Sequence, residues 1–239
     1  RYGSAAAVET VRAWAAAIER WAYVESAALA AEKGTFPLCD TDKLLERPNI
    51  RRLDADVREV IARHGLRNGC LTSIAPTGTI SLVAGNVSSG IEPVFDFHYR
   101  RRVLQADGSA REEVVEDFAH ALYRQKLGAS AALTDAFVTA GELSPREHLA
   151  MQAAVQAHVD SSISKTINCP ADMPFEAFRD IYLEADALGL KGCTTFRPNA
   201  ITGSVLTPIA GETMAAPAPA RASADVSAAG AGGAVELAP

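Results

Sequence analysis

The sequence predicts an α/β protein in which helices alternate with the short strands of a largely parallel sheet. Three observations support this fold class. Several segments carry apolar residues at the i, i+3, i+4, i+7 spacing of a helix, and shorter apolar or alternating stretches between them are typical of strands. Glycine stands where the helical spacing stops. The C-terminal half has the order helix, strand, helix, strand, which is typical of sheets whose ligands collect at one end of the strands.

The composition is that of an ordinary globular protein and argues against several classes. The chain has 239 residues, of which 48% are hydrophobic and 22% charged, and its net charge is -6 at pH 7. A negative charge argues against a general nucleic-acid binder, because affinity for the phosphate backbone needs clustered Lys and Arg. No stretch approaches the roughly 18 to 20 apolar residues of a membrane span, and no signal-peptide pattern opens the chain. We therefore expect a cytoplasmic protein without a membrane or nucleic-acid partner.

The cysteines and histidines show no recognisable metal site or disulfide framework. The cysteines are scattered without Cys-x-x-Cys spacing or paired histidines nearby: Cys39, Cys70, Cys169 and Cys193. Cys70 is expected to be packed, because free cysteine is among the most buried residue types. Four histidines lack ligand-like spacing and are expected to be surface or cap residues: His98, His120, His148 and His158. No metal ligand is predicted.

The first element is a helix over residues 1–33. Apolar residues recur among many alanines at close to helical spacing: Val8, Val11, Trp14, Ile18, Trp21 and Leu29. Alanine on the remaining faces predicts that neighbours enclose this helix, and Gly34 ends it. Because the chain begins inside such a helix without an initiator methionine, we expect that its start has been lost.

A short helix and a strand are predicted next. Asp54 stands as the N-cap of a helix that Gly65 stops. Residues 66–74 are predicted to form the strand that delivers the following turn, with Cys70 on it.

The functional prediction depends on the turn after this strand and on the short helical segment that follows it. Proline fixes one dihedral angle of the turn, and glycine lets a ligand approach the backbone. Threonine and serine hydroxyl groups lie beside the unpaired N–H groups of a helix start, where the dipole favours negative charge. The predicted phosphate-binding residues are Pro76, Thr77, Gly78, Thr79, Ile80 and Ser81. The alternative is a turn that caps a helix and binds nothing.

A second polar loop, residues 85–93, follows this turn. It is rich in Gly, Ser and Asn and ends at Pro93, so two polar loops flank one short apolar element. Ligands are often bound by such loops on a rigid scaffold. Glu92 is a candidate ligand contact, although capping of the local turn is the favoured role.

The C-terminal half contains a hairpin, three helices and two strands. Asp107-Gly108 predicts a hairpin between residues 94–105 and 109–113. Helices are predicted around the face of Val115, Phe118, Ala119 and Leu122, over 145–158 from the capping box at Ser144, and from Pro174 to the stop at Gly189. Strands are predicted over 161–168 and 191–197. The first has a polar face that either lines a cavity or is structural: Asp160, Ser161, Ser162, Ser164 and Asn168.

The end of the chain differs in composition from the rest. From about residue 208 it consists mainly of Ala, Pro, Gly and Ser, which cannot bury enough apolar surface to offset the entropy of ordering. We therefore predict a folded domain over residues 1–207 and a disordered tail over 208–239.

Three blocks in this order resemble the C-terminal part of an adenosylcobalamin-dependent, class II ribonucleotide reductase. They read IAPTGTISLVAGNVSSGIEPVF (74–95), SSISKTINCPADMPF (161–175) and GLKGCTTFRPNAITGSVL (189–206). The resemblance covers about residues 1–206. It implies the C-terminal portion of a ten-stranded α/β barrel of the ribonucleotide reductase type, in which the turn from Pro76 to Ser81 binds the 5′ phosphates of the substrate.

The resemblance also implies radical chemistry that this chain does not complete. In that family adenosylcobalamin produces a thiyl radical on a loop cysteine, which abstracts the ribose 3′ hydrogen. An Asn and a Glu transfer protons, and a cysteine pair reduces the 2′ position. The family places these groups upstream of the phosphate turn, and residues 1–75 contain no such loop. No catalytic residue is therefore predicted here, and the chain is expected to be inactive alone.

The implied cofactor is adenosylcobalamin. The implied partners are a ribonucleotide substrate, with a diphosphate slightly favoured, and a thioredoxin-type reductant. A homodimer is one assembly that the resemblance allows.

Class I reductases carry a radical-relaying tyrosine pair where this chain has Thr194 and Thr195. Threonine cannot be oxidised in that way, and a radical made on site by cobalamin needs no relay, which favours class II. Cys193 is expected to be a packed or lining thiol. The tail lacks the cysteine pair that receives electrons from thioredoxin, which leaves re-reduction open.

The predicted function is therefore ribonucleotide reduction, with this chain supplying the phosphate turn. The alternative is a non-catalytic nucleotide- or phosphate-binding module that kept the turn and lost the chemistry. A glycyl-radical enzyme fits less well, because no convincing Arg-x-x-Gly-Tyr type of segment lies near the C-terminus.

Overall fold

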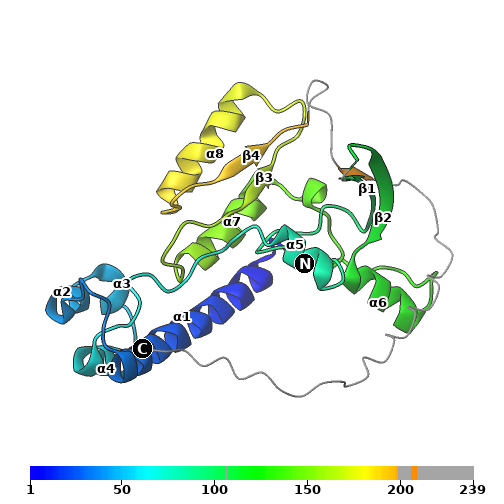
Figure 1. Cartoon of the computed structure of the whole chain (residues 1–239). Coiled ribbons are helices and arrows are strands. Elements are labelled where there is room, and N and C mark those ends of the chain that lie inside the picture. Colours follow the sequence, from blue (N-terminus) through cyan, green and yellow to red (C-terminus); the bar gives the residue numbers. More distant parts are fainter. Residues whose placement is uncertain (106, 199–205, 209–239) are drawn as a thin grey trace, which may run out of the picture. The chain divides into compact units, whose positions relative to one another are not determined.

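A computed structural model describes residues 1–105, 107–198 and 206–208 (Figure 1). The predicted tail, apart from Pro208, lies outside the described residues. The helices are α1 (Ala5–Lys33), α2 (Thr41–Leu45), α3 (Pro48–Arg51), α4 (Ala55–His64), α5 (Gly78–Val83), α6 (Phe118–Leu127), the 3-10 helix η1 (Ala140–Glu142), α7 (Pro145–Gln156) and α8 (Phe175–Ala187). The strands are β1 (His98–Leu104), β2 (Ala110–Glu116), β3 (Thr166–Asn168), β4 (Thr194–Phe196) and β5 (Leu206–Pro208).

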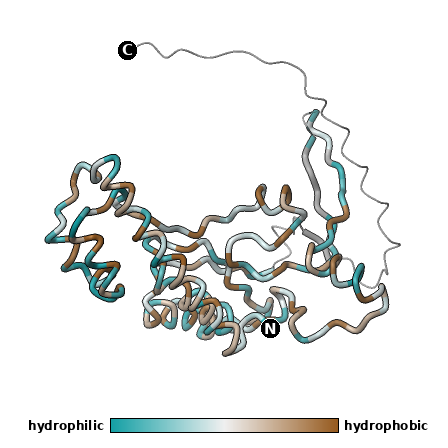
Figure 2. Tube along the Cα trace, turned by 90° about the horizontal axis from the view of Figure 1, so that it is seen from below, coloured by the Kyte–Doolittle hydropathy of each residue, from teal (hydrophilic) through white to brown (hydrophobic). Residues whose placement is uncertain are grey.

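Two small sheets are formed by these strands. β3 and β4 are parallel neighbours, with Thr166 opposite Thr194, and β1 is the central strand of an antiparallel sheet of order β2-β1-β5. The hairpin predicted around Asp107-Gly108 is confirmed as β1 and β2, which pair from His98–Glu116 to Leu104–Ala110. Figure 2 shows that this hairpin is largely hydrophilic. The described strands do not close a barrel by themselves, so the ten-stranded barrel stays a prediction at this stage.

The strand predicted over residues 66–74 is wrong. Among the described residues this segment makes one parallel bridge, between Ile74 and Ile163. The Asp160 carboxylate instead accepts hydrogen bonds from the N–H groups of Leu71 (2.7 Å) and Thr72 (3.3 Å). The N–H groups of Ser161 and Ser164 also donate to the carbonyls of Thr72 and Ile74. The pairing with residues 161–164 thus stops at a single bridge, and the Asp160 side chain holds the part of the segment before it. Cys70, predicted to be packed, is exposed on this segment.

The long N-terminal helix is confirmed, but the prediction that neighbours enclose it is wrong for the described residues. Trp14, Ile18 and Trp21 are 63–65% exposed in the described part of the chain. The buried face is formed by smaller or polar residues: Ala15, Glu19, Tyr23, Ser26, Ala27 and Ala30. The helix packs on α4 and α7 through this face. Because alanine lets two helices approach closely, the small residues form the contact and the tryptophans remain outside it.

Helix α7 joins two of the three hydrophobic clusters. Its Leu149 packs in the cluster of β3 and α8 with Ile167 and Ile181, and its Val155 packs with Ala15 of α1 in another. The remaining cluster lies between α1 and α2 to α4 and has at its centre Tyr23, Ala27, Ile50, Val57, Ile61 and Leu66. α7 begins as predicted, with the reciprocal capping box of Ser144 and Glu147 and with proline in its first turn. No helix of the described residues is long and apolar enough to cross a membrane.

A buried ionic network connects β3, α7 and the second polar loop. The Lys165 side chain is fully buried, and its ammonium group donates to the Glu92 carboxylate (2.7 Å) and to the carbonyl of Thr166. The other Glu92 oxygen accepts from the N–H of Thr166 (2.5 Å). A buried ion pair is tolerated only when both partners are hydrogen-bonded in this way. The pair therefore fixes the end of the loop to strand β3.

His148 completes this network as a neutral imidazole. Its Nδ1 accepts from the Lys165 ammonium (2.9 Å), which requires that the proton is on Nε2, facing the carbonyl of Ala140 at 3.2 Å. Burial and the nearby Lys165 charge lower the pKa of His148 to about 4. Burial also lowers the pKa of Lys165, and Glu92 opposes that shift. The prediction of a surface or cap role for His148 is wrong, because the side chain has no exposed area.

The depressed pKa of His148 makes stability depend on pH. The folded chain binds fewer protons than the unfolded chain between about pH 4 and the ordinary histidine pKa near 6.5. The stabilisation of the folded chain by neutral His148 is therefore complete above about pH 6.5 and is lost as pH falls toward 4. This loss lowers the unfolding free energy by roughly 2–3 kcal/mol.

We expect urea unfolding at pH 7, 6 and 5 to show this loss in the wild type and a much flatter profile in His148→Gln. His64→Gln, on partly exposed α4, is the matched control and should keep the wild-type slope. A wild-type unfolding free energy that stays constant from pH 7 to 5 would contradict the buried neutral imidazole.

Candidate functional site

The predicted phosphate turn forms the start of α5. Thr77, the N-cap residue, has φ 48° and ψ 28°, which is the left-handed region, and no side chain caps the helix. The N–H of Ser81 donates to the carbonyl of Thr77 (2.8 Å). The first N–H groups of a helix have no intrahelical partner, and in the described residues those of Gly78, Thr79 and Ile80 have no partner from elsewhere. The turn thus presents three adjacent amide donors on exposed residues.

Thr77 also ties the turn to the second loop. Its hydroxyl oxygen accepts from the N–H of Gly90 (2.8 Å). Gly90 has φ 58°, and a Cβ atom at this position would lie 2.8 Å from the carbonyl oxygen of Ala75. Only glycine combines this backbone angle with so close an approach. The two loops predicted to flank the site are therefore in direct contact.

Ser81 lies on the inner side of α5 and is buried, in contrast with its neighbours in the turn. Its hydroxyl group donates to the carbonyl of Val87, and its own carbonyl accepts from the N–H of Asn86 (2.8 Å). The exposed residues of the turn are Pro76, Gly78, Thr79 and Ile80, and Ile80 is 68% exposed. The structure therefore brings the six predicted residues together in two orientations. The side chains of Thr77 and Ser81 contact the second loop, whereas the other four residues are exposed.

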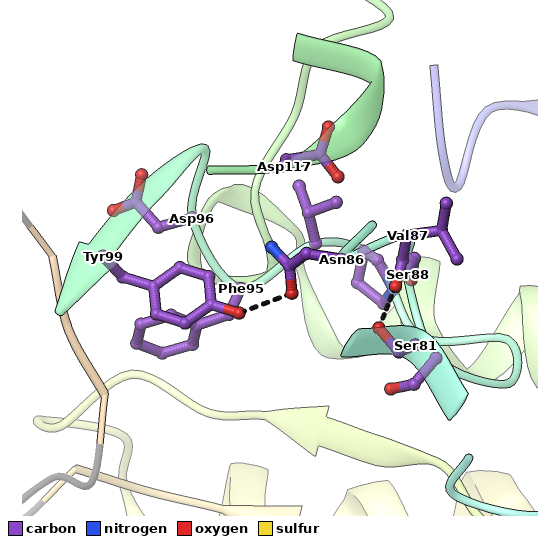
Figure 3. Close-up of a pocket in the computed structure, with 11 residues that line it drawn as sticks. Ser81, Asn86, Val87, Ser88, Phe95, Asp96, Tyr99 and Asp117 are labelled. Carbon is purple, nitrogen blue, oxygen red and sulfur yellow. Dashed lines mark hydrogen bonds between the residues drawn. The ribbon is translucent and has the colours of Figure 1, made fainter. Parts of the chain in front are cut away.

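A small polar pocket lies between the second loop and the hairpin (Figure 3). The Tyr99 hydroxyl donates to the Asn86 side chain (2.9 Å), and Asn86 donates to the carbonyl of Glu116 (3.0 Å). The pocket has a volume of about 80 Å³ and is lined by both Asp96 and Asp117. Two carboxylates repel a phosphate, and this volume suits a few water molecules. This pocket therefore does not suit a phosphate.

Glu92 does not cap its local turn as predicted. Its side chain reaches Lys165 and the backbone of Thr166, more than seventy residues away in the sequence. The favoured interpretation was wrong because sequence alone did not indicate a buried lysine. The local turn is closed by Ser88, whose hydroxyl group donates to the Glu92 carbonyl.

The polar face predicted over residues 160–168 is present but mainly structural. Burial alternates, with Ile163, Lys165 and Ile167 inside and Ser162 and Ser164 exposed. Asp160 holds the segment before the phosphate turn, as described above. The alternation of inward and outward residues was predicted correctly, but one of the buried residues, Lys165, is charged.

The thiol and threonine groups near β4 give no sign of a reaction centre. Cys169 and Cys193 belong to the cluster around Ile167, and burial raises the pKa of both thiols. Its place in this cluster confirms Cys193 as a packed thiol. A raised pKa means less thiolate and lower reactivity. The Thr195 hydroxyl is hydrogen-bonded to that of Tyr182 (2.9 Å).

One cluster of titratable side chains was missed by the sequence analysis. His98 and His120 both contact Glu116, and His120 is buried, so the prediction of a surface or cap role is wrong for it. Two signals pointed to this cluster. Glu116 and His120 are four residues apart, and His98 lies on the strand that the hairpin pairs with Glu116.

Comparisons with known proteins place the chain in a family. The ribonucleotide reductase, barrel domain, family model matches residues 1–196. The vitamin B12-dependent ribonucleoside-diphosphate reductase of Mycobacterium tuberculosis is 35% identical over 240 residues, which cover 94% of this chain and 31% of that protein. The enzyme of the same name from Thermoplasma acidophilum is 34% identical over 204 residues, which cover 79% of this chain and 24% of the relative.

A solved structure supports the fold. The class Id ribonucleotide reductase alpha subunit of Actinobacillus ureae superposes with a TM-score of 0.58 at 20% identity, covering 85% of this chain and 36% of that subunit. The chain thus spans about a third or less of the proteins that it matches. The family match and the identity across most of the chain show that it belongs to the ribonucleotide reductase barrel-domain family.

Proposed function

We propose that this chain is a C-terminal portion of the catalytic barrel of a ribonucleoside-diphosphate reductase, and that the turn from Pro76 to Ser81 binds the phosphates of the substrate. The observation that carries this proposal is that Gly78, Thr79 and Ile80 are exposed and that their N–H groups have no partner among the described residues. Backbone donors at a helix start bind anions well, because the dipoles of the peptide groups add to the hydrogen bonds.

The contacts behind the turn support the same role. Thr77 is held by Gly90, and the loop that contains Gly90 is fixed through Glu92 to the buried Lys165. A donor set that is already positioned loses little entropy when it binds a ligand, which raises affinity. Ser81 contributes by holding the inner side of α5 against Val87, while the Thr79 hydroxyl group stays available to the ligand.

The proposed reaction is conversion of a ribonucleotide to a deoxyribonucleotide by thiyl radical chemistry, with adenosylcobalamin as the cofactor that starts the radical. The names of the relatives and the threonines at positions 194 and 195 support this assignment. The two pockets described, of about 80 and 370 Å³, do not fit so large a cofactor, since pockets of 300–1,000 Å³ enclose ordinary drug-sized ligands. No described residue is therefore assigned to the cobalamin. A thioredoxin-type reductant is the proposed electron source.

Substitution of Gly78 tests the turn without disturbing the protein around it. A Cβ atom at Gly78 meets no atom within 4 Å, so the added side chain would crowd only the ligand. In the reductase that contains this chain, we expect Gly78→Val to weaken binding of a ribonucleoside diphosphate about tenfold or more, because hydrogen bonds to a charged group contribute roughly 1.5–3 kcal/mol. Isothermal titration calorimetry measures the change.

Gly141→Val is the matched control, because Gly141 also has open space around it and lies in η1. It should leave nucleotide affinity unchanged. Equal affinities of the Gly78 variant and the wild type would show that the phosphates bind elsewhere.

Substitution of Gly90 tests the contact between the two loops. Gly90→Ala places a methyl group against the Ala75 carbonyl and keeps a left-handed backbone angle, so we expect an unfolding free energy lower by about 2–3 kcal/mol and a raised KM. Gly189→Ala is the matched control, because Gly189 has φ 73° and an added Cβ atom would meet no atom within 4 Å. It should cost only about 1 kcal/mol, and equal losses in urea unfolding would contradict the importance of the close approach.

A further inference from the structure

Two histidines and a glutamate meet at the junction of the β1–β2 hairpin and α6. His98 is the first residue of β1 and pairs with Glu116, the last residue of β2, while His120 lies in the first turn of α6. The Glu116 Oε1 atom is 3.2 Å from His98 Nε2 and 2.9 Å from His120 Nδ1. The three potential ligand atoms all lie within 4.8 Å of one another.

We propose that His98, Glu116 and His120 form a binding site for a divalent transition-metal ion of the zinc class. Zinc takes imidazole nitrogen and carboxylate oxygen ligands at about 2.0–2.2 Å in a tetrahedral arrangement, which places neighbouring ligand atoms about 3.3 Å apart. Both distances to Glu116 are close to this value. The two imidazole nitrogens lie within 4.8 Å of each other, and the His98 ring is partly exposed, so it has room to rotate toward a shared ion. The site is independent of the phosphate turn and of the proposed reaction.

The surroundings suit a metal site with one open position. The His120 ring is stacked on Phe97 with centroids 5.3 Å apart, and Phe137 meets its edge at 6.1 Å. This aromatic shell excludes water from the back of the site. The side chains of His98 and Glu116 are 21% and 23% exposed, so the site is open to solvent on the side of these two residues. Three protein ligands and an open position are the pattern of zinc sites that also bind a water molecule or substrate.

Arg124 determines which nitrogen of His120 carries the proton in the metal-free cluster. Its Nε–H donates to His120 Nε2 (3.3 Å), so the His120 proton is on Nδ1 and is donated to Glu116. A metal ion on Nδ1 would displace that proton, and neutral His120 would then carry its proton on Nε2, facing the guanidinium. Binding therefore requires Arg124 to move away, although it also donates to the carbonyl of Ala131. A residue that accepts from Nε2–H would strengthen the site, because metal-bound histidines usually donate their second N–H to an acceptor.

The experiment is a titration of the metal-free chain with Zn²⁺ by calorimetry and with Co²⁺ by visible absorption. We expect one ion per chain, and at least tenfold weaker binding in both His120→Asn and Glu116→Gln. Glu116→Gln keeps a hydrogen-bond acceptor for both histidines, so it separates loss of a ligand from loss of folding, which circular dichroism checks. Affinity should fall on acidification, because protons compete with the metal ion for the imidazole nitrogens.

Two further variants sharpen the test. Arg124→Gln offers an acceptor to His120 Nε2–H and should bind Zn²⁺ more tightly than the wild type. His64→Asn, in α4, removes a histidine outside the cluster and should bind as the wild type does. The proposal is overturned if the wild type shows no saturable binding of one ion, or if the His120 and Glu116 variants keep wild-type affinity.

Discussion

The position of the candidate site depends on the buried ion pair between Lys165 and Glu92. Lys165 is a buried residue that directly precedes β3, and Glu92 lies near the end of the loop that follows α5. The ion pair therefore joins two described segments that are not paired as strands of one sheet. The neutral imidazole of His148 accepts from the same ammonium group and connects α7 to the pair. Loss of Glu92 would leave the fully buried Lys165 without its counter-ion, which costs about 3–5 kcal/mol. The loop therefore has one position in the folded chain.

The proposed phosphate turn is held by contacts that leave the start of α5 unpaired. The side chains of Thr77 and Ser81 are hydrogen-bonded to the second loop, at Gly90 and Val87, whereas Gly78, Thr79 and Ile80 are exposed and their N–H groups have no partner among the described residues. Two of the hydroxyl groups of the turn therefore support its backbone rather than remaining free. A backbone site needs such support, because its donors cannot be adjusted by side-chain rotation.

Much of the local structure could be predicted because it rests on local physics. The helices follow from apolar spacing and caps, the hairpin from Asp107-Gly108, and the phosphate turn from proline, glycine and threonine. The pairing of residues across the hairpin was harder to predict from the sequence. A two-residue turn at Asp107-Gly108 would place His98 opposite Asp117, whereas the observed pairing of Leu104 with Ala110 makes the loop one residue longer and brings His98 to Glu116. A shift of one residue changes which side chains meet, so the cluster at this junction could not be predicted from the turn signal.

The amino-acid sequence by itself determined the family and the main helices, including the turn that opens α5, since these depend on neighbouring residues and on ordered motifs. Only the tertiary structure decided that Asp160 replaces a strand ladder at residues 71–72, that alanines rather than tryptophans form the contact of α1, and that Glu92 pairs with Lys165. These outcomes depend on which distant segments meet and on how much water each contact excludes. Neither quantity is encoded in the local spacing of residues.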